Sequence, residues 1–449
     1  MKVEVSYKEI WRISWPIILS SLANTVITFT DVAYVGRIGV QAMAASALGG
    51  VFYFLLVMAG MAVGIGAQIL IARRAGEERH GEIGNILDHC LVILLAFSGL
   101  AMLFIYTIMP QLMYWIVGDA EVARQTIVYL QARGWGLACM MVLVSFRSFY
   151  TGITITRIIT YTTLVMMVVN LLLNDAFVIG RWGIAPMGIV GSGWASAIAE
   201  TVAAVYALLY ALRRSFLKEY NLFQLKRVHF DTVRQILVLS GPIVLQHVFS
   251  MGCWFLFFVF IEKLGAAELA VSNVVRGVYM VLMTPVWGFS QSSSSMVSNL
   301  IGQGKEQEVI PLVNKIVRLS LFIGSVGVLL GLVFRDALFA LTTHDTSIIA
   351  DAVPVFYVIC GATVCFSVSM VYLSGVSGTG ATVVAMVMEV LSLLVYLVYV
   401  WYFTIETNGT LITVWFSEFV YWFLLGLLAF LYLRSLRWLQ TAQKLNEEN

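Results

Sequence analysis

Long apolar stretches alternate with short polar ones along the whole chain. A membrane-spanning helix needs roughly 20 mainly apolar residues. Stretches of that length lie near 13–35, 48–71, 86–108, 127–146, 158–179, 192–212, 236–260, 270–297, 316–336, 350–372, 381–403 and 411–433. The pattern predicts an all-α membrane protein of twelve transmembrane helices.

The longest polar stretch between spans divides the chain into two six-helix halves. We expect an N-terminal lobe, a cytoplasmic linker, a C-terminal lobe and a cytoplasmic tail over 1–212, 213–234, 235–433 and 434–449. Segments 14–76 and 240–302 correspond at a constant offset of 226 positions, which pairs Gly39 with Gly265. A half-length repeat with an even number of spans is typical of secondary transporters built from two pseudo-symmetric bundles.

Composition agrees with a membrane protein and excludes a soluble one. Charged residues make up 12% of the chain and the mean hydropathy is +0.90, whereas soluble domains carry about twice that charged fraction. Most of the 27 Lys and Arg residues fall on one side of the membrane when the N-terminus is placed inside. The positive-inside rule therefore predicts that both termini lie in the cytoplasm.

Charged groups inside spans are few, and each costs about 2.5–3.5 kcal/mol on insertion scales. Asp31 is of special interest because its counterpart in the repeat is Phe257, so only one half keeps the carboxylate. For Glu200, Glu389 and Glu418 an internal pair or a helix interface is as good an interpretation as a functional role. Other charged residues in or near spans include Arg133, Asp175 and Arg276.

An amide pair in the fifth span suggests an ion site. Asn170 and Asn174 are four residues apart and so share a helix face, and Asp175 follows about 100° away. Oxygens of amides beside a carboxylate suit Na⁺, or hold a protonatable Asp. The corresponding part of the second half, 393–398, reads Leu-Leu-Val-Tyr-Leu-Val and lacks these amides.

Aromatic, sulfur and acidic side chains in the second half could line a substrate cavity. Such groups bind planar organic cations through cation–π and dispersion contacts. The candidates are Trp254, Phe257, Tyr279, Met283 and Glu389.

Enzyme signatures are absent from the sequence, which contains no HExxH, no GxSxG, no P-loop and no dinucleotide fingerprint. We therefore expect that the chain is not an enzyme and needs no cofactor. We also expect a transporter that binds no nucleic acid and works as a monomer. Without an ATP site, transport would be driven by an ion gradient, which supplies about 2.3 kcal/mol per charge per 100 mV.

Several stretches resemble the multidrug and toxic compound extrusion (MATE) family, in particular its bacterial NorM-like and DinF-like branches. They include SWPIILSSLANTVITFTDVAYVGRIG (14–39), FRSFYTGITITR (146–157) and GRWGIAPMGIVGSGWAS (180–196). The resemblance implies a MATE fold in the bacterial inner membrane. It also implies an antiporter that exports cationic or amphipathic drugs in exchange for H⁺ or Na⁺.

The resemblance places the first-lobe cation site on Asp31, Asn170, Asn174 and Ser196, with possible Na⁺ binding at the first three. Asn174 stands where DinF-like members have Asp and NorM-like members have Asn, and Asp175 could supply a second carboxylate. Ser196 replaces a Thr.

NorM-like members also carry acidic residues where this chain has Ser250 and Thr363. The resemblance therefore gives no support to a second-lobe cation site, for which only Glu389 could compensate. The positions at which the repeat copies differ, Asp31 against Phe257 and the two amides against leucines, predict that ion coupling lies in the N-terminal lobe alone. Two alternatives remain open: a lipid-linked precursor flippase of the same superfamily, and a membrane receptor or scaffold that transports nothing.

Overall fold

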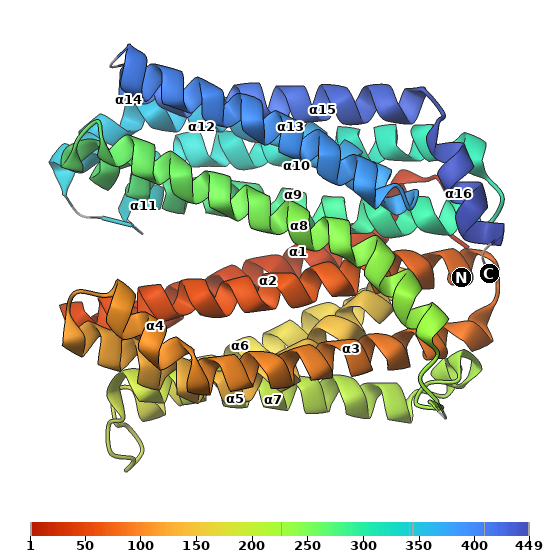
Figure 1. The fold of residues 1–449 in the computed structure, drawn as a ribbon, viewed down its shortest axis with the longest axis horizontal. Helices are drawn as coiled ribbons and strands as arrows, with labels where there is room; N and C mark the ends of the chain where they lie inside the picture. Colours follow the sequence, from red (N-terminus) through yellow and green to blue (C-terminus); the bar gives the residue numbers. More distant parts are fainter. Residues whose placement is uncertain (1, 226, 341, 344, 408, 448–449) are drawn as a thin grey trace. The chain divides into compact units, whose positions relative to one another are not determined.

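The computed structural model describes residues 2–225, 227–340, 342–343, 345–407 and 409–447, and it is helical throughout these ranges apart from short connections (Figure 1). The predicted linker includes Lys226 and the predicted tail includes residues 448–449, which lie outside the described residues. The first half contains α1 (Tyr7–Gly36), α2 (Val40–Gly76), α3 (His80–Thr107), α4 (Met109–Ile116), α5 (Ala120–Gly152), α6 (Arg157–Phe177), α7 (Gly188–Arg213) and the short 3₁₀ helix η1 (Ser215–Tyr220).

The second half repeats this order. It contains α8 (Phe230–Glu262), α9 (Ala266–Gly302), η2 (Glu306–Glu308), α10 (Val309–Val333), α11 (Arg335–Ala340), α12 (Thr346–Gly378), α13 (Thr382–Trp401), a π-helical turn η3 (Tyr402–Glu406), α14 (Leu411–Trp415), α15 (Ser417–Arg434) and α16 (Trp438–Glu447). Twelve of the described helices are long and apolar enough to cross a membrane, as the sequence predicts.

Helix–helix packing divides the chain into two compact units. The N-terminal unit comprises Leu19–Gly241, and the C-terminal unit comprises Lys2–Ile18 together with the chain from Pro242 onward. The predicted lobes do not include this exchange, in which α1 is divided after Ile18 and α8 after Gly241. Pro16 and Pro242 lie inside these two helices next to the division points, where a proline removes a backbone hydrogen bond and bends the helix.

Each unit packs its helices in the same order. In the N-terminal unit α5 lies against α2, α3 and α7, and α6 lies against α7. In the C-terminal unit α12 lies in the same way against α9, α10 and α15, and α13 lies against α15. The matched packing is the structural counterpart of the sequence repeat.

The second helices of the two halves begin and end at equivalent positions. Helices α2 and α9 are each 37 residues long, and their bounds differ by the 226-residue offset. The residue before each of them is a glycine, Gly39 with φ +144° and Gly265 with φ +155°. Because side chains disfavour this backbone conformation, both positions need glycine.

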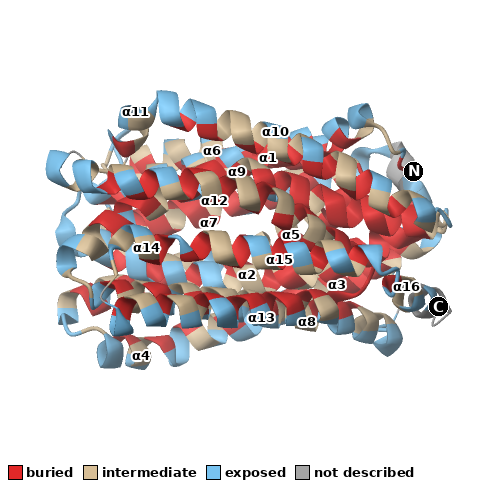
Figure 2. Ribbon diagram, turned by 90° about the horizontal axis from the view of Figure 1, so that it is seen from above, coloured by how far each residue is buried: buried red, intermediate tan, exposed pale blue. Residues whose placement is uncertain are grey.

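Burial follows a membrane pattern. In the C-terminal unit, buried residues run along α9, whereas exposed residues are frequent along α8 and α13 (Figure 2). Many of these exposed residues are large and apolar. Phe255 on α8 is 70% exposed and Phe423 on α15 is 65% exposed. Exposed aromatic residues on long apolar helices suit contact with lipid rather than water.

Candidate functional site

Asp31 lies at the centre of a hydrogen-bonded cluster in the N-terminal unit. Its Oδ1 accepts from Nδ2 of Asn174 at 2.7 Å and from Nδ2 of Asn170 at 3.1 Å. Its Oδ2 accepts from the Ser196 hydroxyl at 3.2 Å, and Asn170 also donates to Ser196 at 3.1 Å. The structure therefore brings together the four residues that the sequence comparison grouped.

The three helices of this cluster are held close by small residues and hydroxyl contacts. The hydroxyls of Ser20 on α1 and Thr163 on α6 lie 2.7 Å apart. Between α6 and α7, a Cβ on Gly191 would lie 2.7 Å from the carbonyl oxygen of Phe177. Only glycine allows the two helix ends to approach this closely, and the approach sets the position of Ser196.

The cluster also contains an acceptor without a donor. Asn174 donates to the backbone oxygen of Asn170 at 3.1 Å and to its Oδ1 at 3.2 Å. Its own Oδ1 is buried and has no hydrogen-bond partner within the described part of the chain. A buried polar atom without a partner is destabilising, so this oxygen is available to a bound cation or water.

Asp175 does not join the cluster. Its carboxylate lies 3.3 Å from the Arg181 guanidinium and accepts from the Tyr34 hydroxyl at 3.4 Å. The reason is the helical twist, which turns Asp175 about 100° away from Asn174. The geometry thus gives no support to Asp175 as the second carboxylate of the Asp31 cluster.

A second polar network lies one helical turn further along α7. Glu200 forms an ion pair with Arg133 of α5 at 3.2 Å and accepts from the Tyr53 hydroxyl at 2.8 Å. The Arg133 guanidinium also lies over the Tyr53 ring, 4.2 Å from its centroid. Sequence reasoning found the charges of Glu200 and Arg133 but not their pairing, because the two residues come from helices far apart in the chain.

The C-terminal unit has a related network without an arginine. Tyr279, which follows Tyr53 by 226 positions, donates to Oε2 of Glu418 at 3.0 Å. Trp422 donates to the same oxygen at 3.0 Å, and Tyr396 donates to Oε1 at 3.2 Å. Among the described residues no Lys or Arg forms an ion pair with Glu418. The buried glutamate is held here by neutral donors.

Most of the predicted substrate-cavity residues belong to packed interior. Phe257, Tyr279 and Met283 are buried in the core of the C-terminal unit, and Trp254 packs edge-on against Phe258. In this conformation Phe257 and Tyr279 are buried by ring packing, and Tyr279 also by its hydrogen bond to Glu418, so their part in a substrate cavity stays a prediction.

Glu389 lies in a cluster of its own. Its carboxylate accepts from the Gln246 amide, from the Ser250 hydroxyl and from the Tyr421 hydroxyl, the last at 3.3 Å. The side chain is buried. In this conformation Glu389 accepts hydrogen bonds within the C-terminal unit, and its part in a substrate cavity stays a prediction.

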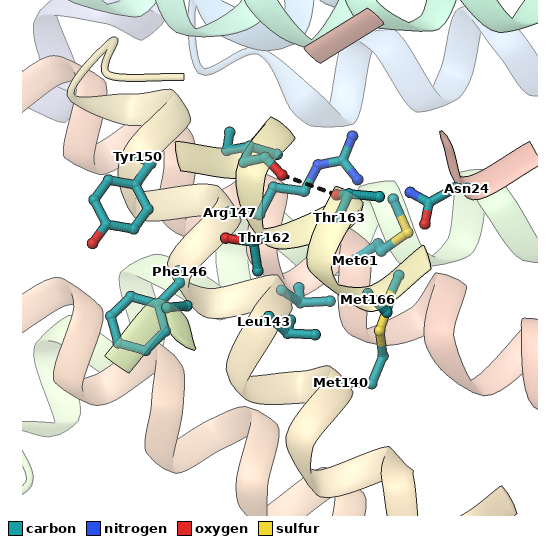
Figure 3. A pocket seen from close by; sticks show the side chains of 13 residues that line it. Asn24, Met61, Met140, Leu143, Phe146, Arg147, Tyr150, Thr162, Thr163 and Met166 are labelled. Carbon is teal, nitrogen blue, oxygen red and sulfur yellow. Dashed lines mark hydrogen bonds between the residues drawn. The ribbon is translucent and has the colours of Figure 1, made fainter. Parts of the chain in front are cut away.

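A small pocket of about 60 Å³ lies in the N-terminal unit. In Figure 3, Phe146 and Tyr150 lie on one side of it and Asn24, Met61 and Met166 on the other. Asn24 precedes Asp31 by seven residues on α1, about 10 Å along the helix axis. Met166, which also lines the pocket, precedes Asn170 by four residues on α6, so the pocket lies about one to two helical turns from the Asp31 cluster.

Comparison with known proteins decides the family. The sequence model of the MatE family matches residues 16–176 and, a second time, residues 242–402. The chain belongs to the MatE family. The two matches are offset by the same 226 residues that relate the two halves, so the family model recognises the repeat as well as the fold.

Individual MatE relatives agree with this. A probable multidrug resistance protein NorM from Photorhabdus laumondii is 23% identical over 354 residues, which cover 79% of this chain and 78% of the relative. A protein of the same name from Pasteurella multocida is 24% identical over 352 residues, 78% of this chain and 75% of the relative. MatE proteins are a family of transporters, and this member is a multi-pass membrane protein.

Solved structures confirm the fold. A crystal structure of a MATE protein in complex with MaL6 superposes with a TM-score of 0.88 at 18% identity, covering 97% of this chain and 96% of the other. The expected arrangement of twelve helices in a MATE fold is therefore confirmed.

Proposed function

We propose that this chain is a secondary multidrug antiporter, which exports cationic or amphipathic organic compounds in exchange for H⁺ or Na⁺. Its place would be the bacterial inner membrane, with both termini in the cytoplasm. The names of the NorM relatives support efflux of drugs, and the clustering of basic residues supports the orientation.

The Asp31 cluster is the observation that carries the coupling mechanism. It joins α1, α6 and α7 through one carboxylate and three neutral side chains. While Asp31 is ionised, Asn170, Asn174 and Ser196 stabilise its charge by donating to it. A bound H⁺ or Na⁺ neutralises the carboxylate and weakens these three donations, so α1 is held less firmly to α6 and α7.

This change can drive transport if the ion binds one conformation more tightly than the other, because a ligand shifts an equilibrium only by its difference in affinity. The ion would enter from outside and favour release of the drug. The pocket beside Asn24 is far smaller than the 300–1,000 Å³ typical of drug sites. Drug binding there would therefore require the pocket to widen.

Flux in proteoliposomes tests the proposal. Purified protein is reconstituted and loaded with ethidium, and efflux is followed under a pure pH gradient and then under a pure Na⁺ gradient. We expect at least one gradient to drive efflux in the wild type and neither to do so in Asp31→Asn. Equal efflux by wild type and Asp31→Asn would show that the coupling site lies elsewhere.

The flux measurement and a growth assay together separate the alternatives. A receptor or scaffold would give no ion-dependent flux at all. A lipid-linked precursor flippase would leave a knockout strain with a growth defect in the absence of any drug, whereas a drug exporter would leave growth normal until a drug is added.

A further inference from the structure

We propose that Arg133 and Glu200 set the affinity of Asp31 for its coupling cation, with Glu200 drawing the Arg133 charge away from the site. Both act as positioning residues that tune the site without binding the ion. The inference rests on the proposed function only in naming Asp31 as the coupling carboxylate. It concerns how tightly that carboxylate holds a cation.

The two networks are joined through one face of α7. Ser196 donates to Asp31, and Glu200, four residues further along the same helix, binds Arg133. Residues four apart lie one above the other on a helix. This spacing places the Arg133–Glu200 pair about one helical turn from the residue that binds Asp31, near enough for its charges to act on the carboxylate. The phenol of Tyr129 on α5 lies in the same electrostatic environment. Tyr53 of α2 completes the titratable groups around the pair.

The position of Glu200 is fixed by a close helix contact. A Cβ on Gly136 of α5 would lie 2.3 Å from Oε2 of Glu200 and 2.7 Å from Cα of Ala197 on α7. Helices α5 and α7 therefore touch backbone to backbone beside the ion pair. This contact leaves Glu200 little freedom to move and so fixes the carboxylate that Arg133 binds.

Arg133 has a donor to spare. Its Nη2 binds Glu200, whereas its Nη1 is buried and has no hydrogen-bond partner among the residues that the structure describes. A buried N–H group without a hydrogen-bond partner costs free energy, so an anion that accepts from it is stabilising. When the coupling cation leaves, the ionised Asp31 becomes such an anion, and Arg133 can share its charge between the two carboxylates.

The C-terminal unit provides an internal comparison. There Glu418 is held by Tyr279, Trp422 and Tyr396, all neutral donors. A buried glutamate that accepts a hydrogen bond from the tyrosine at this repeat position, Tyr53 or Tyr279, thus does not need an arginine for its stability. The arginine is found in the unit that has Asp31, and the neutral donors are found in the unit that has Phe257 in its place.

The positive charge of Arg133 near Asp31 weakens the binding of a coupling cation, and the negative charge of Glu200 offsets it. Neutralising Arg133 and neutralising Glu200 should therefore change the cation affinity of Asp31 in opposite directions. Removing the charge in Arg133→Gln should strengthen proton binding at Asp31. Removing the partner in Glu200→Gln should leave the Arg133 charge uncompensated and weaken proton binding. We expect shifts of about one pH unit, or tenfold in proton affinity, in the two directions.

The measurement is a pH titration of the protonated-carboxyl stretch by infrared difference spectroscopy on the purified full-length protein. The Asp31 band is assigned by subtracting Asp31→Asn in each background, which also removes the contribution of Glu200. Glu418→Gln serves as the matched control and should leave the Asp31 midpoint unchanged. If a single variant fails to fold, the double variant Arg133→Gln/Glu200→Gln replaces it, because its two glutamines carry no charge. The titration midpoint of Asp31 in the double variant should then lie within half a pH unit of the wild-type midpoint.

Opposite shifts in the two single variants support the inference. Shifts in the same direction, or no shift in either, overturn it and leave a purely structural ion pair. The titration needs no transport, so a failed flux experiment on the wild type would refute the proposed function without deciding this inference.

Discussion

Phe257 and Tyr396 pack against each other in the C-terminal unit with ring centroids 5.8 Å apart, at the positions that follow Asp31 and Asn170 by 226 residues. A hydrogen-bonded polar pair in one unit is thus an aromatic pair in the other. Phe257 also packs edge-on against Trp415 at 5.0 Å. The same place in the fold carries ion chemistry in one unit and core packing in the other.

This difference predicts that Phe257→Ala acts on stability alone. The side chain is fully buried, and truncation of a buried Phe costs about 3–5 kcal/mol. We expect a clear fall in the thermal unfolding temperature of the purified protein in detergent, with the pH midpoint of Asp31 unchanged. Phe255→Ala, at a lipid-facing position two residues away, is the control and should unfold close to the wild-type temperature.

The two aspartates near the cluster should respond differently to neutralisation. Asp31→Asn removes the carboxylate that three side chains bind and should reduce ion-driven efflux to less than about a tenth. Asp175→Asn breaks a partly exposed contact with Arg181 of a kind worth about 1 kcal/mol or less, and should leave efflux within about twofold. Efflux rates at matched protein levels check both; a severe loss in Asp175→Asn would place that carboxylate in the coupling site.

Gly136 should be intolerant of any side chain. A methyl group there would meet Glu200 and the backbone of Ala197, and overpacking of this kind costs about 1–3 kcal/mol. Gly136→Ala should therefore lower the unfolding temperature and disturb the Arg133–Glu200 pair. Gly99→Ala is the matched control, because a Cβ at that glycine meets nothing within 4 Å. Equal stability of the two variants would contradict the close contact.

Neutralising Glu389 tests whether the second unit takes part in coupling. The sequence places coupling in the N-terminal unit alone, so Glu389→Gln should keep the ion dependence of efflux and change its rate by no more than about fivefold. The Gln246 and Ser250 donors can still bind the amide oxygen of the new side chain. Loss of the response to the ion gradient, at a normal protein level, would assign coupling to both units.

Much of the fold follows from the order of residues. The apolar runs predict the spans because each must be long enough to cross a bilayer, and the repeat predicts matched packing through paired positions such as Gly39 and Gly265. The exchange of segments at Ile18 and Gly241 could not be predicted, because hydropathy shows how apolar a helix is and not which other helices it packs against.

The candidate site shows the same division. Asn170 and Asn174 could be placed on one face from spacing alone, and the resemblance added Asp31 and Ser196. The partner of Arg133 could not be found, since the ion pair depends on how closely α5 approaches α7 at Gly136. Segment 393–398 is mostly apolar, so the sequence indicates only that it lacks the two amides. The structure adds that Tyr396, at the position equivalent to Asn170, donates a hydrogen bond to Glu418.

The division of α1 has a consequence for biosynthesis. Val3 donates its backbone N–H to Asn299 at 3.0 Å, and the Ser14 hydroxyl lies 2.6 Å from that of Ser292. These partners are synthesised 296 and 278 residues after the residues that bind them. Until α9 has been synthesised, which requires about two-thirds of the chain, the N-terminal part of α1 lacks these hydrogen-bond partners, so native packing of the C-terminal unit cannot be completed before that point.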